Sequence, residues 1–305
     1  MQEHDFHIIR THGLTKTFGE HRAVNNVDLL VPQGTVYGFL GPNGSGKSTT
    51  MKLLLGLMKP TAGEVFINGR KLTKASRPEL LGRVGSMIEA PPGYGHLTGW
   101  ENLQIVQSML GLEERQIAQA LDIVRLTKNK DKLVKNYSLG MKQRLALGVA
   151  LIGNPEMLIL DEPINGLDAN GVAWMRKKLT NFAQEGKSVL LSSHLMSEVE
   201  LTATHVAILN HGKIQVYDSL ENLQYQKNAV VFGIPDNSTS LLDSLNYHGI
   251  SVSHVTDNTH KNKYIALNIS TRELFQYAVE SKTTLDFLAP QHDSLESIYF
   301  DYLNK

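Results

Sequence analysis

The chain has 305 residues and a formal net charge of zero, since 30 Lys and Arg balance 30 Asp and Glu, and this balance argues against nucleic acid as a partner. It contains no cysteine, which excludes disulfides and thiolate metal sites. No apolar run reaches the roughly 18 residues that a membrane helix needs, and the polar start lacks the apolar core of a secretory signal, so a function at a membrane requires a separate spanning partner.

A glycine-rich loop between a strand and a helix is the first strong pattern along the chain. Residues 36–40, VYGFL, predict a buried strand, GPNGSGKSTT follows at 41–50, and the run 51–58 predicts a helix. The glycines let successive backbone N–H groups point at phosphate oxygens. Lys47 is expected to reach the β- and γ-phosphates, and Ser48 to bind Mg²⁺. The nucleotide-binding residues predicted in this loop are Gly41, Pro42, Asn43, Gly44, Ser45, Gly46, Lys47, Ser48 and Thr49.

Two further strands and a capped helix are predicted next. Residues 61–69, TAGEVFING, predict a strand that ends in an Asn-Gly turn, and RVGSMI at 83–88 predicts another strand. Glu89 closes that strand, ahead of two prolines and two glycines. Thr98 and Glu101 predict a capping box at the start of a helix. Glu89 is either an ordinary solvated loop residue or a member of a chemical site.

A helix with a polar start is predicted within residues 137–155, YSLGMKQRLALGVALIGNP. Ser138 occupies its N-cap position and Gly140 its first turn, ahead of a helical apolar pattern. This helix start is either a second seat for phosphate or an ordinary cap that binds no anion.

Two more predicted strands end in chemically active side chains. MLILDEP at 157–163 predicts a buried parallel strand with carboxylates at its C-terminal edge. Asp161 can hold Mg²⁺ there, and Glu162 can polarise the water that attacks a γ-phosphate. His194 follows the apolar strand SVLLS at 188–192, where a lone histidine is either a structural hydrogen-bonding group or a catalytic one.

In this order the motifs resemble those of the ATP-binding subunits of ATP-binding cassette (ABC) transporters. GPNGSGKST resembles Walker A, YSLGMKQ the family signature, LILDEP Walker B, NGLD at 165–168 the D-loop, and His194 the switch histidine. The resemblance covers about residues 7–218 and implies that Phe18 stacks on adenine. It also implies the α/β fold of a P-loop NTPase cassette, with a mixed sheet core and a helical subdomain at about residues 98–153.

The signature departs from the usual LSGGQ of the family. Leu139 replaces its first glycine and Met141 its glutamine, whereas Ser138 and Gly140 are kept. A phosphate contact from these two kept residues therefore remains expected. Gln143 is a candidate substitute for the missing polar side chain.

Glu89 stands where the family usually has a glutamine that touches Mg²⁺ and the attacking water. Together with the variant signature, this exchange resembles the ATPases of bacitracin-export and lantibiotic-immunity systems. A carboxylate is a stronger Mg²⁺ ligand than an amide oxygen. Glu89 is therefore expected to bind the metal and to take part in catalysis.

The resemblance implies an ATPase, dependent on ATP and Mg²⁺, that forms a homodimer around two ATP molecules. It would power a separate multi-span permease from the cytoplasmic face of a bacterial membrane, exporting a peptide antibiotic of the lantibiotic or bacitracin type. Glu162 would act as the base, His194 would contact the γ-phosphate, and Ser138 and Gly140 would contact the ATP of the partner copy. The alternative is an ABC-family ATPase that acts on ribosomes or nucleic acid. A P-loop kinase does not account for SLGMKQ or His194.

A small α+β domain is predicted over residues 219–305, after a cassette that spans residues 1–218. AVVFGI, ISVSHV, KYIALNI and TLDFL predict strands, and TSLLDSLNYHG and TRELFQYAVES predict helices. This β-α-β-β-α-β order is typical of a ferredoxin-like unit, and DSLESIYFDYLNK predicts a closing helix. Such an appendix is expected to serve dimerisation or regulation, by analogy only.

Overall fold

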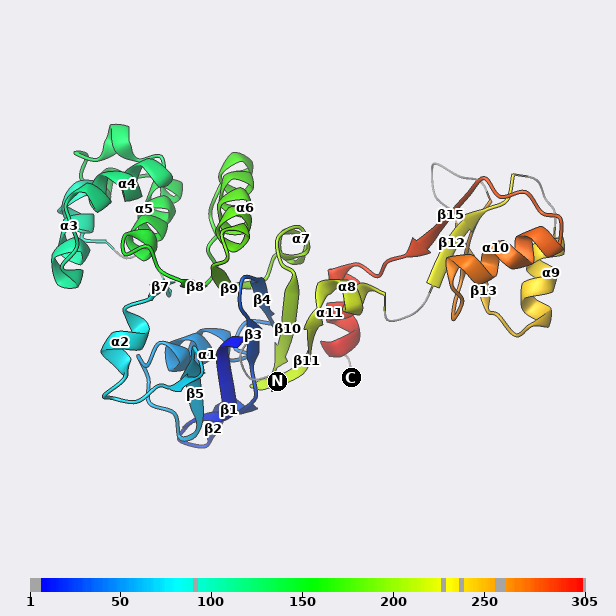
Figure 1. Cartoon of the computed structure of the whole chain (residues 1–305), viewed down its shortest axis with the longest axis horizontal. Helices are drawn as coiled ribbons and strands as arrows, with labels where there is room; N and C mark the ends of the chain where they lie inside the picture. Colours follow the sequence, from blue (N-terminus) through cyan, green and yellow to red (C-terminus); the bar gives the residue numbers. More distant parts are fainter. Residues whose placement is uncertain (1–6, 90–92, 226–228, 236–238, 256–261, 304–305) are drawn as a thin grey trace. The chain divides into compact units, whose positions relative to one another are not determined.

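The chain divides into two compact units, residues 1–218 and 219–304 (Figure 1). The residues that this computed structural model describes are 7–89, 93–225, 229–235, 239–255 and 262–303. None of the helices in these ranges is long and apolar enough to cross a membrane.

A five-stranded antiparallel sheet forms one end of the first unit. Its strands are β1 (His7–Phe18), β2 (His21–Val27), β3 (Leu30–Pro32), β5 (Ala62–Ile67) and β6 (Arg70–Lys71). The predicted Asn-Gly turn joins β5 to β6, and Asn68 and Gly69 both have the positive φ that a tight hairpin needs. The β1–β2 hairpin places Phe18 directly opposite His21. One wall of the site described below is built on this hairpin.

A six-stranded sheet lies at the centre of the first unit, in the order β11-β10-β4-β9-β8-β7. Its strands are β4 (Val36–Leu40), β7 (Val84–Met87), β8 (Met157–Leu160), β9 (Ser188–Ser193), β10 (His205–Asn210) and β11 (Lys213–Ser219). Every residue of β4, β8 and β9 is buried, which confirms the predicted buried strands. These three strands run parallel, so their carboxyl ends meet at one edge of the sheet.

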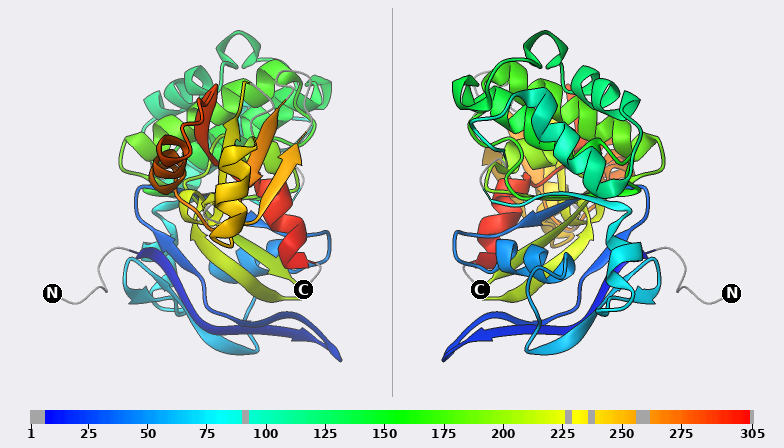
Figure 2. Two further views of the ribbon diagram at one scale, coloured as in Figure 1. Left: turned by 90° about the vertical axis from the view of Figure 1, so that its right-hand side faces the viewer. Right: turned by 90° about the vertical axis from the view of Figure 1, so that its left-hand side faces the viewer.

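Three of the helices form a group of their own, and other helices lie beside the central sheet (Figure 1). Figures 1 and 2 show α3, α4 and α5 at one end of the unit and the antiparallel sheet at the other, with the central sheet between them. The helices are α1 (Lys47–Leu54), α2 (Arg77–Leu81), α3 (Gly99–Leu110), α4 (Arg115–Ile123), α5 (Leu139–Leu151), α6 (Ala169–Gln184) and α7 (Met196–Glu200), with short 3-10 turns at Thr127–Asn129 and Val134–Asn136.

Side-chain caps mark the starts of α3 and α5, and one glycine explains where α1 ends. The predicted capping box is confirmed, because Glu101 N–H donates to Thr98 Oγ1 and Thr98 N–H donates to Glu101 Oε2. Ser138 caps α5 by accepting a hydrogen bond from Met141 N–H. The prediction of helix through residue 58 is wrong, since α1 stops at Leu54 and Gly56 then adopts a left-handed backbone.

The second unit has a four-stranded antiparallel sheet in the order β13-β14-β12-β15. Two helices separate its strands as β-α-β-β-α-β, which confirms the predicted ferredoxin-like arrangement, and a closing helix follows. Its core is formed by apolar side chains such as Phe232, Leu241 and Leu274. The elements are α8 (Leu220–Gln224), β12 (Ala229–Gly233), α9 (Ser240–Tyr247), β13 (Val252–Val255), β14 (Lys263–Ala266), α10 (Thr271–Glu280), β15 (Phe287–Gln291) and α11 (Leu295–Leu303).

Candidate functional site

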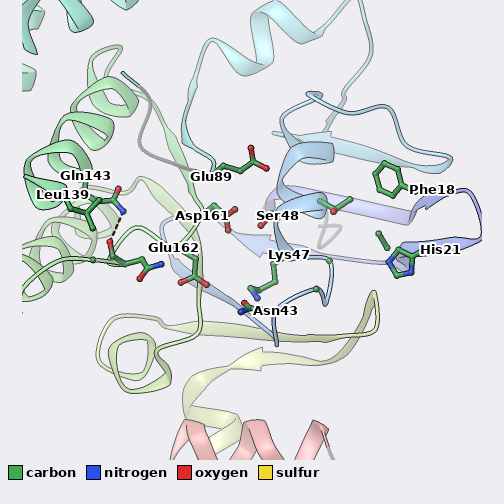
Figure 3. Close-up of a pocket in the computed structure, with 16 residues that line it drawn as sticks. Phe18, His21, Asn43, Lys47, Ser48, Glu89, Leu139, Gln143, Asp161 and Glu162 are labelled. Atoms are coloured by element: carbon green, nitrogen blue, oxygen red, sulfur yellow. Dashed lines mark hydrogen bonds between the residues drawn. The ribbon is translucent and has the colours of Figure 1, made fainter. Parts of the chain in front are cut away.

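A cavity of about 690 Å³ lies in the first unit, where the glycine-rich loop meets the carboxyl ends of the central strands (Figure 3). Lys47, Ser48 and Asp161 are at its centre, Phe18 and His21 at one end, and Leu139 and Gln143 at the other. The predicted site residues that line it are Phe18, Asn43, Gly44, Gly46, Lys47, Ser48, Thr49, Glu89, Asp161 and Glu162. Segments far apart in the sequence therefore form one pocket, as the motif spacing predicts.

The phosphate loop, residues 41–49, is shaped by glycines at positive φ, a conformation that residues with a side chain rarely adopt. Gly46 precedes α1 with φ 107°, and a Cβ there would lie 2.3 Å from Ala23 O. Three predicted loop residues, Gly41, Pro42 and Ser45, are not part of the cavity lining. Ser45 Oγ is buried, and no described residue hydrogen-bonds to it.

Lys47 is held across this loop by two backbone carbonyls. Its side chain is buried, and Nζ donates to Gly41 O at 2.6 Å and to Pro42 O at 3.1 Å. Burial lowers the pKa of Lys47, an effect partly opposed by the nearby carboxylates of Glu162 and Asp161. A cation with so few solvent contacts is well placed to pair with an incoming phosphate.

Gly46→Ala is expected to destabilise the fold by about 2 kcal/mol or more, because it adds backbone strain and a collision with Ala23 O. Urea unfolding with circular dichroism measures this loss. Gly44→Ala is the matched control, since Gly44 also has positive φ but a Cβ there meets nothing within 4 Å. Equal free energies of unfolding for the two variants would contradict the steric account of the loop.

The acidic edge of the site is organised by β9. Ser192 Oγ donates to Asp161 Oδ1 at 2.5 Å and accepts a hydrogen bond from Glu162 N–H at 2.9 Å. Sequence reasoning missed Ser192, although a serine that follows the apolar centre of a buried strand could have signalled it. Both acids are therefore fixed by one hydroxyl group.

Glu162 is also held by the histidine at the end of β9. His194 Nδ1 lies 2.9 Å from Glu162 Oε2, and Glu162 has the unusual φ of 50°. His194 lies outside the cavity lining and about half exposed. His194 is therefore a structural hydrogen-bonding group, and its partner Glu162 is the candidate catalytic base.

The donor set at the centre of the cavity fits Mg²⁺ bound together with phosphate. The Ser48 hydroxyl and the Asp161 carboxylate both face the cavity, and Mg²⁺ prefers such oxygen ligands. Within the described ranges, no group of three or more His, Asp or Glu side chains could hold a metal alone. Magnesium sites commonly combine one or two carboxylates with phosphate oxygens and water.

Glu89 lines the cavity, but its carboxylate is paired. β7 ends at Met87, so Glu89 lies in the following loop rather than in the strand, with a left-handed φ of 64°. Glu89 Oε1 forms an ion pair with Lys52 Nζ of α1. The two prolines that follow lie in 90–92, outside the described residues.

The aromatic end of the cavity is formed by the β1–β2 hairpin. Phe18 is about half exposed there, with Lys16 Nζ 5.1 Å from its ring centre. His21 stands opposite Phe18 and also lines the cavity, a position that sequence reasoning did not single out. An exposed ring at the mouth of a phosphate site suits stacking on a base.

Ser138 and Gly140 line a different cavity, of about 460 Å³. Leu139 and Gly166 border both cavities, and a Cβ on Gly166 would lie 2.3 Å from Leu139 Cδ2. Leu139, which replaces a signature glycine, therefore packs closely on Gly166. The chain does not bring Ser138 and Gly140 to its own phosphate loop.

Gln143 lines the first cavity and connects two segments of its wall. Its Nε2 donates to Asn165 O at 3.0 Å, and its buried Oε1 finds no partner among the described residues (Figure 3). This hydrogen bond ties α5 to the segment after Glu162. The hypothesis that Gln143 replaces the signature glutamine stays a prediction.

Comparison with known proteins finds a matching family and named relatives. A family model described as ABC transporter matches residues 24–165. A lantibiotic transport ATP-binding protein of Streptococcus pyogenes is 41% identical over 220 residues, which cover 71% of this chain and 94% of that protein. A bacitracin transport ATP-binding protein of Bacillus licheniformis is 45% identical over 209 residues, which cover 68% of each chain.

Solved structures give the same picture of the fold. An ATP-binding subunit of an ABC transporter has 28% sequence identity and a TM-score of 0.65, covering 72% of this chain and 92% of that one. A bacterial ABC transporter cassette, solved as a dimer, has 25% identity and a TM-score of 0.65, covering 69% and 98%.

Proposed function

Because this chain belongs to the ABC transporter family and is an ABC ATPase, we propose that it energises a separate membrane permease by closing as a homodimer on two ATP molecules. The observation that carries this proposal is the convergence of Lys47, Asp161 and Glu162 on one cavity. The first two residues suit a metal-bound triphosphate, and Glu162 lies where a base is needed.

Each residue has a distinct task in the proposed reaction. Lys47 and the loop N–H groups bind the β- and γ-phosphates, and Phe18 stacks on the adenine. Ser48 and Asp161 would hold Mg²⁺, which would supply positive charge to neutralise the phosphates. Glu162 orients the attacking water and accepts its proton.

Two neighbours keep Glu162 in place for this task. Ser192 accepts the hydrogen bond of its backbone N–H, and His194 contacts its carboxylate. A base fixed on both sides needs little rearrangement before it acts. His194 is proposed to contact the γ-phosphate as well when the nucleotide is bound.

A dimer explains why Ser138 and Gly140 line a cavity of their own. In the proposed assembly, the start of α5 in one copy faces the phosphate loop of its partner, and the γ-phosphate lies between them. The N-terminus of a 13-residue helix suits this anion. Each ATP would then be enclosed only when two copies close, which couples binding to movement.

The permease and its cargo are proposed from the relatives. Two of them carry names that refer to lantibiotic and bacitracin transport. We propose export of a peptide antibiotic of this type, giving resistance or immunity, with this chain at the cytoplasmic face of a bacterial membrane. Glu89 and the variant signature are proposed to mark the same subgroup.

Purification in mild detergent tests the partner. The tagged chain, extracted from membranes of its own cells, is expected to bring down a multi-span protein identified by mass spectrometry. An unrelated tagged cassette purified in parallel controls for capture of abundant membrane proteins. Ribosomes or nucleic acid in place of a multi-span protein would contradict this proposal and favour the alternative function.

A further inference from the structure

An ion pair joins two elements that meet at the cavity wall. Lys52 belongs to α1, the helix that follows the phosphate loop, and Glu89 to the loop after β7. Lys52 Nζ and Glu89 Oε1 are paired, with 26% of the Lys52 side chain and 64% of the Glu89 side chain exposed. The pair thus links the nucleotide loop to the candidate metal ligand.

Lys52 acts on the cavity through Glu89 rather than directly. It lies five residues after Lys47, which places it about 140° around the helix and about 7.5 Å further along the axis. Glu89 belongs to the cavity lining and Lys52 does not. A direct contact between Lys52 and the phosphates is therefore not expected.

The charges of the lining explain why Glu89 needs a partner. Three carboxylates, Glu89, Asp161 and Glu162, line the cavity together with Lys47. A triphosphate entering this space meets repulsion from every carboxylate that lacks a nearby cation. Lys52 neutralises the carboxylate of Glu89. A glutamine at this position, as the family usually has, would carry no charge to neutralise.

The backbone at Glu89 favours movement of the side chain over movement of the loop. Asp161 N–H donates to Met87 O at 2.7 Å. This hydrogen bond anchors the end of β7 beside Asp161, which is itself a candidate metal ligand. Glu89 itself has a left-handed φ of 64°, a conformation that persists only where its surroundings hold it. Its exposed carboxylate can exchange partners by rotation of the side chain alone.

We propose that Lys52 is a positioning residue that holds Glu89 against α1 until Mg–ATP binds, and that Glu89 then exchanges Lys52 for Mg²⁺. This inference rests on the proposed function. It has two consequences of opposite sign. Lys52 favours binding of metal-free ATP by neutralising Glu89, and it raises the Mg²⁺ concentration that hydrolysis requires by competing for Glu89.

The test is Lys52→Met, made in the natural chain and in a Glu89→Gln chain. In the natural chain, metal-free ATP measured in EDTA by equilibrium dialysis is expected to bind roughly 2- to 5-fold more weakly, as for loss of a partly exposed ion pair. The Mg²⁺ concentration for half-maximal hydrolysis is expected to fall. In the Glu89→Gln chain, Lys52→Met is expected to change neither quantity.

Lys71→Met is the matched control, since it breaks an exposed ion pair with Glu64 on the β5–β6 hairpin. It is expected to change neither measurement. If Lys52→Met changed ATP affinity and Mg²⁺ dependence equally in the Glu89→Gln chain and in the natural chain, the inference would be overturned, because Lys52 would then act without Glu89. Unchanged binding and Mg²⁺ dependence in the natural chain would overturn it as well. A natural chain that binds no ATP would instead contradict the proposed function.

Discussion

Glu162→Gln is expected to lower the rate of ATP hydrolysis by roughly 100-fold or more while ATP stays bound. The amide has nearly the same size as the carboxylate and can keep the contact with His194 Nδ1, which lies 2.9 Å from the carboxylate oxygen. It cannot accept a proton from water. Phosphate release gives the rate, and a fluorescent ATP analogue gives the affinity.

His194→Ala is the informative comparison for this variant. It removes the contact that orients Glu162 but leaves the carboxylate in place, so a smaller loss of rate is expected. If Glu162→Gln hydrolysed ATP as fast as the natural chain, Glu162 would not be the base. The water would then need another acceptor at the edge of the cavity.

Lys47→Ala is expected to weaken ATP binding by about 10- to 100-fold, as for loss of a hydrogen bond to a charged group. The ammonium group is buried and already lies at the phosphate loop, so its phosphate contacts require little rearrangement. Titration calorimetry with Mg–ATP measures the change.

Lys71→Ala serves as the surface control, because it removes a lysine from an exposed hairpin of the same unit. Thermal unfolding of both variants separates lost binding from lost folding. Unaltered affinity in a folded Lys47→Ala chain would show that the phosphate loop binds its ligand through the backbone alone.

Local patterns in the sequence were enough to predict most of the fold. The buried strands β4 and β8 are continuous apolar runs, β9 has an apolar centre, and the capping box of Thr98 and Glu101 is a short-range motif. The alternation of strands and helices in the second unit also follows from local periodicity. These features depend on residues close together in the chain.

Side-chain partners across the fold were harder to predict. The pairing of Lys52 with Glu89, the hydroxyl of Ser192 between two acids, and the packing of Leu139 on Gly166 each join residues from different elements. Their sequence separations carry no periodic signal. Lys52 in particular reads as an ordinary exposed lysine on a helix until its partner is known.

Glu89 shows how local sequence patterns and the three-dimensional fold combine. The sequence predicts an acid at the end of a strand, and it leaves open whether Glu89 is a solvated loop residue or part of a site. The fold puts Glu89 in the cavity lining and gives its carboxylate a cation. Its role toward Mg²⁺ remains the prediction that the Lys52 variants test.

Light scattering on Glu162→Gln, with and without ATP, tests most directly whether two copies enclose the nucleotide. The mass is expected to double from 33.9 kDa when ATP is added. Adding Gly140→Asp should abolish this doubling, because a Cβ at position 140 makes only an ordinary contact with Leu167 Cδ2 at 3.6 Å, while the added carboxylate repels phosphate. An unchanged mass at saturating ATP, or equal doubling with Asp at position 140, would contradict the shared site.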